Sequence, residues 1–331
     1  MNKTIIAIVL FLPLNMIAQT PLNDNSWEKV NTYSDNFNLT KHSNWFELTG
    51  SHWGIGIFRT TEIKFSSEGS RQYLQLEARA ESGTYYTGGI GIHENGSPFG
   101  YGYYEIEARL NPQSGIQTGF WPAFWTVKSW KTGPPYWYEE IDIFEPGACE
   151  VLDGTHQVGF WHEINEYNSS TTYNREKYRG YSYNLEMNNW HRYAVEWLPD
   201  RIVFYLDGEP FYRILASDNK KIPYHEGHVL YIDLQIHPDC SPSISNGYLG
   251  SFDINFFGYY ELNLDCKTIV NDISDFSTYD YAVKKSISLG GATTIPTNSK
   301  ITLRATDFLE LNAGIEIPIG AEFVLYQSDC N

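Results

Sequence analysis

Three acidic side chains, Glu140, Asp142 and Glu145, are spaced among the apolar residues Ile141, Ile143 and Phe144. Glu140 and Asp142 are two residues apart, so a pleated strand would point both side chains to the same face. Regular alternation would turn Glu145 to the opposite face. A single bulged residue near Ile143 or Phe144 would return Glu145 to the face of the other two acids. We therefore predict a row of three carboxyl groups with Asp142 between two glutamates.

A row of this kind suits the hydrolysis of a bond between two sugars. Retaining enzymes that cleave such bonds place two carboxyl groups roughly 5–5.5 Å apart, one as nucleophile and one as proton donor. Mutual repulsion keeps one acid of such a pair protonated near neutral pH. The alternative is a strand whose acids simply face solvent. Lysine, which is common at exposed strand edges, is absent between Tyr136 and Glu150, and aromatic residues occupy positions 136–138.

The segment 120–125 supplies flat rings that could line a cleft for sugars. Alternation places Trp121 and Trp125 on one face, whereas Phe120 and Phe124 take the other. Aromatic rings offer apolar faces to the C–H side of sugars and polar edges to their hydroxyl groups. We predict that Trp121 and Trp125 line the cleft; burial of both in the core is the alternative. Further candidates are Trp137, directly before the acids, and Trp53 and Trp161.

The elements that must hold these residues are strands. Segments 73–78, 202–206 and 301–304 are rich in β-branched or aromatic residues and partly alternate in polarity. Asp207-Gly208 is a hairpin-turn signal, and no sustained apolar stripe occurs at helical spacing. Many short strands separated by Gly, Asn and Ser predict an all-β fold, namely a β-sandwich of jelly-roll type.

Several other kinds of chemistry lack their motifs. The sequence has no glycine-rich phosphate loop between a strand and a helix, no zinc-binding His-Glu-x-x-His or paired Cys-x-x-Cys, and no Gly-x-Ser-x-Gly. The formal net charge of −17 argues against nucleic acid and against anionic membrane surfaces as partners. It also favours a neutral polysaccharide over a sulfated one as the substrate.

The N-terminus has the pattern of a secretory signal. Lys3 precedes an uninterrupted apolar run from Ile5 to Leu14, and Ala18 followed by Gln19 is a suitable cleavage point. This run is too short to span a membrane, and no other apolar stretch is long enough. We therefore expect residues 1–18 to be a signal peptide and the protein to be secreted, whether to the extracellular space, the periplasm or the cell surface.

The acidic run, Glu140-Ile141-Asp142-Ile143-Phe144-Glu145, resembles the active-site signature of glycoside hydrolase family 16, in the bulged form of laminarinases and agarases. Further motifs resemble the family in the same order, so that the resemblance covers residues 27–262. These motifs are Ser34-Asp35-Asn36-Phe37, the segments 101–109 and 121–125, and the later pair 190–197 and 201–208.

The resemblance implies a role for each acid. Glu140 would be the nucleophile, Glu145 the general acid/base, and Asp142 the residue that orients Glu140. His156 matches a histidine that the family places near the reaction centre, although a structural histidine is the alternative. The resemblance also implies a fold with the cleft on the concave sheet of a concanavalin-like sandwich, and a reaction without a cofactor.

Three departures from the family pattern bear on metal and substrate. Asn36 stands where the family has Glu, and Asn255 stands where its last strand has Asp. Calcium favours charged oxygen ligands, so these changes count against a structural calcium ion, and we expect no metal. The third departure is the segment 233–238, which replaces the laminarinase sequence Asn-Leu-Ala-Val-Gly-Gly. Asp233, Gln235 and His237 share one face by alternation, and we expect this face to bind substrate in the cleft.

The C-terminal part of the chain differs in pattern from the rest. Residues 277–331 resemble a small β-rich module of secreted Bacteroidetes proteins, described as a stack of three coathanger-like turns. The sequence therefore predicts a catalytic domain at 19–262, a linker at 263–276 and this module at 277–331. Sugar binding, surface retention and a structural cap are the roles open to the module.

Four cysteines in a secreted chain indicate two disulfide bonds, which could pair in three ways. Cys149 and Cys240 both fall in the catalytic segment, and Cys266 and Cys330 bracket the C-terminal one. We predict these two pairs.

Together these patterns predict a secreted, monomeric, retaining endo-glycoside hydrolase whose partner is a polysaccharide, above all a β-1,3-glucan of the laminarin type. A galactan hydrolase acting on agar, porphyran or carrageenan is the alternative among hydrolases, and a transglycosylase would use the same acids. The alternative from another class is a non-catalytic carbohydrate-binding protein on the same sandwich.

Overall fold

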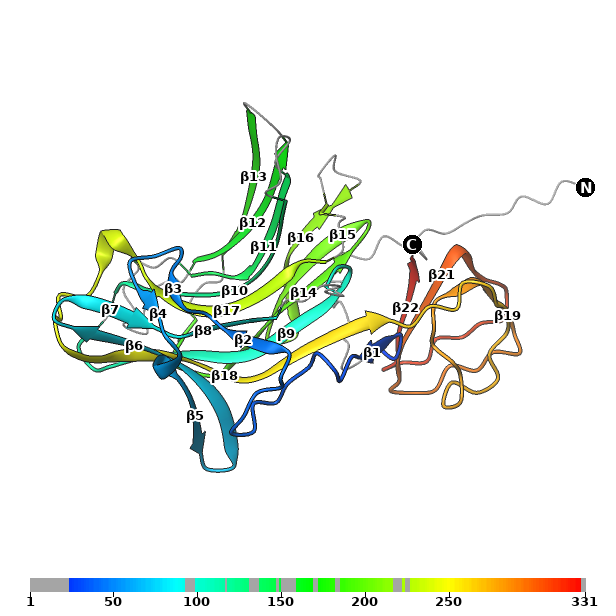
Figure 1. Ribbon diagram of the computed structural model, residues 1–331. Helices are drawn as coiled ribbons and strands as arrows, with labels where there is room; N and C mark the ends of the chain where they lie inside the picture. Colours follow the sequence, from blue (N-terminus) through cyan, green and yellow to red (C-terminus); the bar gives the residue numbers. More distant parts are fainter. Residues whose placement is uncertain are drawn as a thin grey trace, which may run out of the picture.

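The computed structural model describes residues 24–92, 99–116, 118–130, 137–146, 149, 159–168, 172–181, 185–216, 222–223 and 227–328. Within these residues two curved sheets stack on each other and a third, small sheet lies at one end (Figure 1). The predicted all-β sandwich is confirmed. No helix in the described ranges has both the length and the apolar character needed to span a bilayer.

The outer sheet forms the lower layer in Figure 1 and is built around the long strands β9 and β18, which run antiparallel. Its strand order is β16 (Glu209–Leu215), β15 (Arg201–Leu206), β14 (His191–Leu198), β9 (Gly102–Pro112), β18 (Gly247–Leu262), β6 (Arg71–Glu81), β7 (Thr84–Thr87), β4 (Ile57–Phe58) and β3 (Gly50–Ser51), with β1 (Trp27–Lys29) beside β18 and β5 (Ile63–Glu68) beside β6. The 3-10 turn η1 (Thr60–Glu62) joins β4 to β5.

The inner sheet is the upper layer, and it bends upward towards β12 and β13 (Figure 1). All of its described strand pairs are antiparallel. Its strand order is β13 (Thr172–Tyr181), β12 (Gly159–Asn168), β11 (Trp137–Phe144), β10 (Phe120–Trp130), β17 (Val229–Ile236), β8 (Gly89–Ile92) and β2 (Trp45–Glu47). The 3-10 turn η3 (Pro238–Cys240) follows β17.

The main core lies between the two sheets and is formed by alternate residues of each strand. Phe120 and Phe124 of β10 point into it, and Phe144 of β11 contacts Tyr193 and Phe252 of the outer sheet at ring distances of 4.1 and 5.7 Å. Because these residues fill the interior, the residues between them must face outward from the inner sheet. The catalytic candidates belong to that second set.

The small sheet consists of parallel strands in the order β19 (Ile269–Asn271), β20 (Lys284–Leu289), β21 (Lys300–Leu311) and β22 (Glu322–Gln327). It has its own core, which includes Ile287, Leu289, Ile301 and Leu303. The segment 263–276, which we expected to be a linker, contains β19 and contributes Ile273 and Phe276 to this core. Because most residues of this segment are polar, the sequence did not indicate that it forms part of the small sheet and its core.

Candidate active site

The bulge predicted in the acidic strand lies at Ile143. Phe124 of β10 pairs with Phe144, whereas the next residue, Trp125, pairs with Asp142, so Ile143 is the extra residue of β11. Ile143 itself is buried. The shift turns Phe144 into the core and returns Glu145, the next residue, to the outward face.

The bulge brings all three acids to the outward face of the inner sheet. Asp142 lies opposite Trp125 and Glu140 lies opposite Val127, so both share the face of Trp125. The register carried one residue further places Glu145 beside Ala123 on the same face. Asp142 is 5% exposed, whereas Glu140 and Glu145 are half-buried and open to solvent. The predicted row of acids is therefore present, with Asp142 the most deeply set.

Two indole N–H groups of β10 donate hydrogen bonds to carboxylates on this face. Trp121 Nε1 donates to Glu145 Oε1. Trp125 Nε1 donates to Asp233 Oδ2 at 2.8 Å. We predicted both tryptophans as rings that line the cleft, and both lie on the predicted face. Trp121 is half-buried, but Trp125 is only 7% exposed, so its ring offers little area to a sugar.

The strand β17 brings two of the predicted substrate-binding residues to the floor of this face. Asp233 and Gln235 share the face, as alternation predicted, and pair with Ala123 and Trp121 of β10, but they are only 2% and 1% exposed. Burial raises the pKa of Asp233 to about 7; the hydrogen bond from Trp125 opposes this shift and the charge of Glu145 adds to it. These two side chains are thus buried in the floor and do not lie open to substrate.

The segment 52–56, between β3 and β4, covers these buried residues. A Cβ atom on Gly54 would lie 2.6 Å from Gln235 Oε1, and Ile55 N donates to the carbonyl oxygen of Ile236. Trp53 packs edge-on against Trp125 and Tyr231, with ring centroids 4.7 and 5.2 Å away, and is itself 42% exposed. Trp53 is therefore the aromatic residue that this side of the face presents to solvent.

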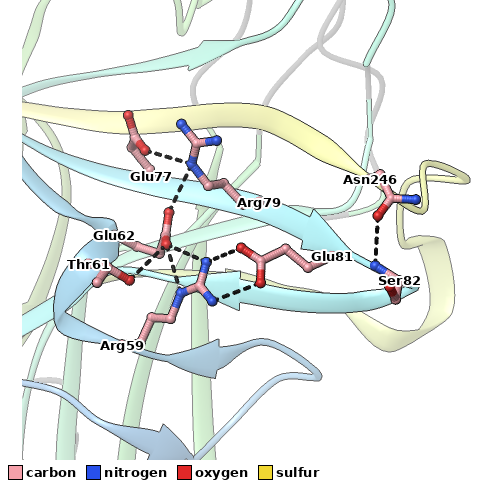
Figure 2. A network of polar contacts seen from close by, with 8 residues as sticks. All are labelled: Arg59, Thr61, Glu62, Glu77, Arg79, Glu81, Ser82 and Asn246. Carbon is pink, nitrogen blue, oxygen red and sulfur yellow. Dashed lines mark hydrogen bonds and ion pairs between the residues drawn. The ribbon is translucent and has the colours of Figure 1, made fainter.

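An ion-pair network on the outer sheet holds the far end of the covering segment (Figure 2). The Arg59 guanidinium binds Glu62 of η1 at 2.7 Å and Glu81 of β6 at 2.5 Å, and it lies over the Tyr86 ring. Arg79 binds Glu62 at 3.2 Å from the other side. The chain that follows the segment is thus fixed to β6 and β7.

The third predicted residue of this segment, His237, directly follows β17 and lies at the edge of the face beside a disulfide bond. Its ring is 5.4 Å from the Trp121 ring, and its Nδ1 accepts a hydrogen bond from Asp239 N. Cys149 and Cys240 form the predicted disulfide, which joins the chain after Glu145 to η3. Cys266 is also disulfide-bonded, and its expected partner Cys330 lies outside the described residues.

Several predicted residues cannot be compared with this geometry. The signal peptide and His156 lie outside the described residues. The backbones of Trp137 and Trp161 lie in β11 and β12, but the described parts of the structure do not include their side chains. Tyr231, which shares the face of Asp233, was missed in the sequence, although the same alternation along β17 points to it.

Within the described ranges, the only group of three side chains close enough to hold a metal ion together is Cys149, His237 and Cys240, and two of these are joined in the disulfide. Asn255, at the position where the family has Asp, is the bulged residue of β18 and donates to Glu107. Arg109 of β9 pairs with Asp253 of β18 at 3.0 Å, so it is a structural partner within the outer sheet.

Solved structures of other proteins share this architecture. A glycoside hydrolase family 16 endo-glucanase from Bacteroides ovatus superposes with a TM-score of 0.55 at 20% identity, over 69% of this chain and 99% of that one. A laminarinase from Flavobacterium sp. UMI-01 gives 0.51 at 22% identity, over 69% and 99%. The kappa-carrageenase from Pseudoalteromonas carrageenovora gives 0.56 at 17% identity, over 75% and 97%. The likeness defines the fold class as a jelly-roll β-sandwich.

Sequence similarity defines the family. The pattern of glycosyl hydrolases family 16 matches residues 54–256, and the chain belongs to this family. A beta-glucanase from Rhodothermus marinus is 31% identical over 204 residues, which are 56% of this chain and 65% of that protein. A beta-glucanase from Acetivibrio thermocellus is 28% identical over 177 residues, 53% of this chain and 45% of that protein. The chain thus spans less than two thirds of the length of these relatives.

Proposed function

We propose that this protein is a secreted, retaining, endo-acting glycoside hydrolase of β-linked polysaccharides. The observation that carries the proposal is the bulge at Ile143, which puts Glu140, Asp142 and Glu145 on one outward face of the inner sheet. A strand that served only to pack would have no need of three carboxyl groups there. Membership of the family and the similarity to beta-glucanases support the same activity.

The reaction proceeds by two displacements. Glu140 attacks the anomeric carbon and the glycosidic C–O bond breaks, while Glu145 donates its proton to the departing oxygen. A water molecule then attacks the glycosyl-enzyme ester, Glu145 takes the proton of that water, and Glu140 is released as a carboxylate. Asp142, set between the two glutamates, orients Glu140. No cofactor takes part.

The proposed substrate is a neutral β-glucan with 1,3 links, of the laminarin type. The net charge of −17 supports a neutral polymer, and a laminarinase is among the proteins that share the fold. A galactan is the second candidate, because the residues of β17 depart from the laminarinase pattern and a kappa-carrageenase shares the fold as well. Exposed rings such as Trp53 suit either polymer.

The test measures release of reducing sugar from laminarin, mixed-linkage glucan, agarose, porphyran and carrageenan in parallel. We expect laminarin to be cleaved fastest. Glu140→Gln and Glu145→Gln should each lower kcat by at least about a thousandfold while the protein stays folded, because each removes a group that acts in the transition state. Lys64→Gln, on the outer sheet, is the matched control and should retain full activity.

Three results would contradict this proposal. Near-normal turnover by either glutamine variant would exclude the assigned roles. Tight binding of laminarin without any product would support a non-catalytic sugar-binding protein. Products longer than the starting oligosaccharide would identify a transglycosylase.

Secretion and the nature of the C-terminal module are also proposals. The Cys149–Cys240 disulfide supports an oxidising compartment outside the cytoplasm. The parallel stack of β19 to β22 is compatible with the three-coathanger resemblance of residues 277–331. Mass determination of the mature N-terminus from the culture medium checks the cleavage after Ala18.

A further inference from the structure

Asp233 is a buried carboxyl group that the two displacements leave without a role. It lies on β17, between β10 and β8, and its neighbours across the sheet are Ala123 and Gly89. A Cβ atom on Gly89 would lie 3.0 Å from the Cβ of Asp233, so β8 closes one side of this carboxyl group and offers it no polar side chain. The side towards β10 is different.

On the β10 side, the small residue Ala123 stands between Asp233 and Glu145. The hydrogen bond from Trp121, which itself pairs with Gln235 of β17, draws Glu145 over β10. The register places Asp233 and Glu145 on opposite sides of Ala123, whose methyl group puts no bulky side chain between them. Asp233 and Glu145 therefore form a pair of acids across a single strand, and the charge of Glu145 acts on Asp233.

Among the described residues, the surroundings of Asp233 supply a donor but no fixed positive charge. Trp125 Nε1 donates to Asp233 Oδ2 at 2.8 Å. The segment 52–56 lies against the neighbouring residues Gln235 and Ile236. The other titratable groups on the elements packed around this face are Glu140, Asp142, Tyr231, His237 and His52.

The two acids are coupled electrostatically. Burial and the charge of Glu145 both raise the pKa of Asp233, which reaches about 7 although the Trp125 N–H opposes the rise. Such coupling is reciprocal, so a charge on Asp233 equally disfavours a charge on Glu145. The last proton of the pair leaves at a pH that depends on both groups.

Resting on the function proposed above, we propose that Asp233 is a positioning residue that shares one proton with Glu145 and so sets the pH range in which Glu145 can act as the acid. While Glu145 holds the shared proton, Asp233 is charged, and this charge helps Glu145 to keep its proton to higher pH. When Glu145 gives its proton to the departing sugar, Asp233 takes up a proton from solvent, and it releases that proton when the water proton returns to Glu145. No net proton is gained or lost by Asp233 over a complete turnover.

The experiment compares pH profiles of kcat/KM for three proteins acting on laminarin. In Asp233→Asn the shape and the Trp125 contact are kept but the charge is lost, so the basic limb should move to lower pH by about one unit or more. In Trp125→Phe the donor is lost, so Asp233 stays neutral to higher pH and no longer helps Glu145 to keep its proton; the basic limb should again move to lower pH. A structural defect would lower both profiles without shifting the basic limb.

A second measurement does not depend on activity: urea unfolding gives the difference in stability between Asp233→Asn and its parent protein at a series of pH values. In the Glu145→Gln background the negative charge beside Asp233 is absent, so this difference should level off at a lower pH and at a smaller value than in the wild-type background. Basic limbs that coincide in the three pH profiles would overturn the proposal, as would a stability difference on Asp233→Asn that is the same with Glu or Gln at position 145. Activity on none of the polysaccharides would instead overturn the proposed function. The unfolding measurements with and without Glu145 would still decide whether the two acids are coupled.

Discussion

At the scale of residues, the face that carries the acids is held by two indole N–H groups of β10, each of which donates to a carboxylate. Alternation along β10 and β17 placed Trp121, Trp125 and Asp233 together. Their hydrogen bonds join residues 24 and 108 positions apart, and no local pattern encodes such pairings. Two tryptophans predicted as sugar platforms are thus donors to carboxylates, and Trp53, a secondary candidate, carries the exposed ring.

Asp233 also makes a prediction for stability. Its pKa of about 7 lies above the ordinary value near 3.9, so between these pH values the folded protein holds a proton that the unfolded chain has lost. The stabilisation from this proton is complete below about pH 4 and is lost as the pH rises through 7. Asp233→Asn should therefore unfold like wild type at pH 4 and be more stable at pH 8, by up to about 4 kcal/mol.

Urea unfolding of both proteins across this pH range measures the difference. Asp265→Asn, in an exposed part of the small sheet region, serves as the control, because the pKa of Asp265 is lowered by its hydrogen bonds to Thr268 and Lys284. The control should lose stability at neutral pH. An equal effect of Asp233→Asn at pH 4 and pH 8 would contradict the titration assigned to Asp233.

At the scale of elements, the bulge was predictable and the covering segment was not. The bulge follows from a conflict within nine residues, since three acids must share one face of a strand whose apolar residues must fill a core. The segment 52–56 has neither alternation nor a turn signature. Its position depends on Gln235 and Ile236 in a distant strand, and only the folded chain reveals it.

Gly54 is the residue that lets this segment lie so close to β17. A Cβ atom would be 2.6 Å from both Gln235 Oε1 and the carbonyl oxygen of Ile236, and the backbone oxygen cannot move aside easily. Gly54→Ala should therefore displace Trp53, raise KM for long oligosaccharides at least about fivefold and lower stability by about 1–3 kcal/mol.

The matched control is Gly291→Ala, because a Cβ atom there would meet nothing closer than 3.9 Å. Michaelis constants for oligosaccharides of increasing length, together with intrinsic tryptophan fluorescence, report on the displacement. An unchanged KM with altered fluorescence would mean that Trp53 moves without contacting substrate.

At the scale of the whole molecule, the small sheet is fixed to the sandwich by a buried charged joint. Arg304 of β21 is 1% exposed and binds Asp24 at 2.8 Å, and its guanidinium approaches Glu196 of β14 at 3.9 Å. The Arg304 guanidinium also lies over the rings of Trp27 and Tyr326. The sequence indicated a separate module but could not reveal this joint, because each charge looks like an ordinary surface residue until its partner is known.

Removing the central cation should weaken the joint strongly. Arg304→Met leaves the buried carboxylates of Asp24 and Glu196 without that partner, which costs about 3–5 kcal/mol in comparable sites. Lys300→Met on the same strand is the control, because its pair with Glu322 is exposed and is worth at most about 1 kcal/mol.

Chemical denaturation followed by fluorescence measures both variants. If Arg304→Met separates the small sheet without unfolding the sandwich, limited proteolysis should cut the chain near residues 263–268 while hydrolysis of laminarin persists. Equal stability of the two variants would contradict the importance of the joint.

A stiff connection of this kind has a geometric consequence. If the terminal sheet is tethered to a cell envelope or to a polymer, the catalytic acids cannot rotate freely around that anchor, as they would on a flexible linker. They would instead lie at a constant distance and orientation from the anchor, so that only polysaccharide chains that pass the anchor in one orientation could be cut.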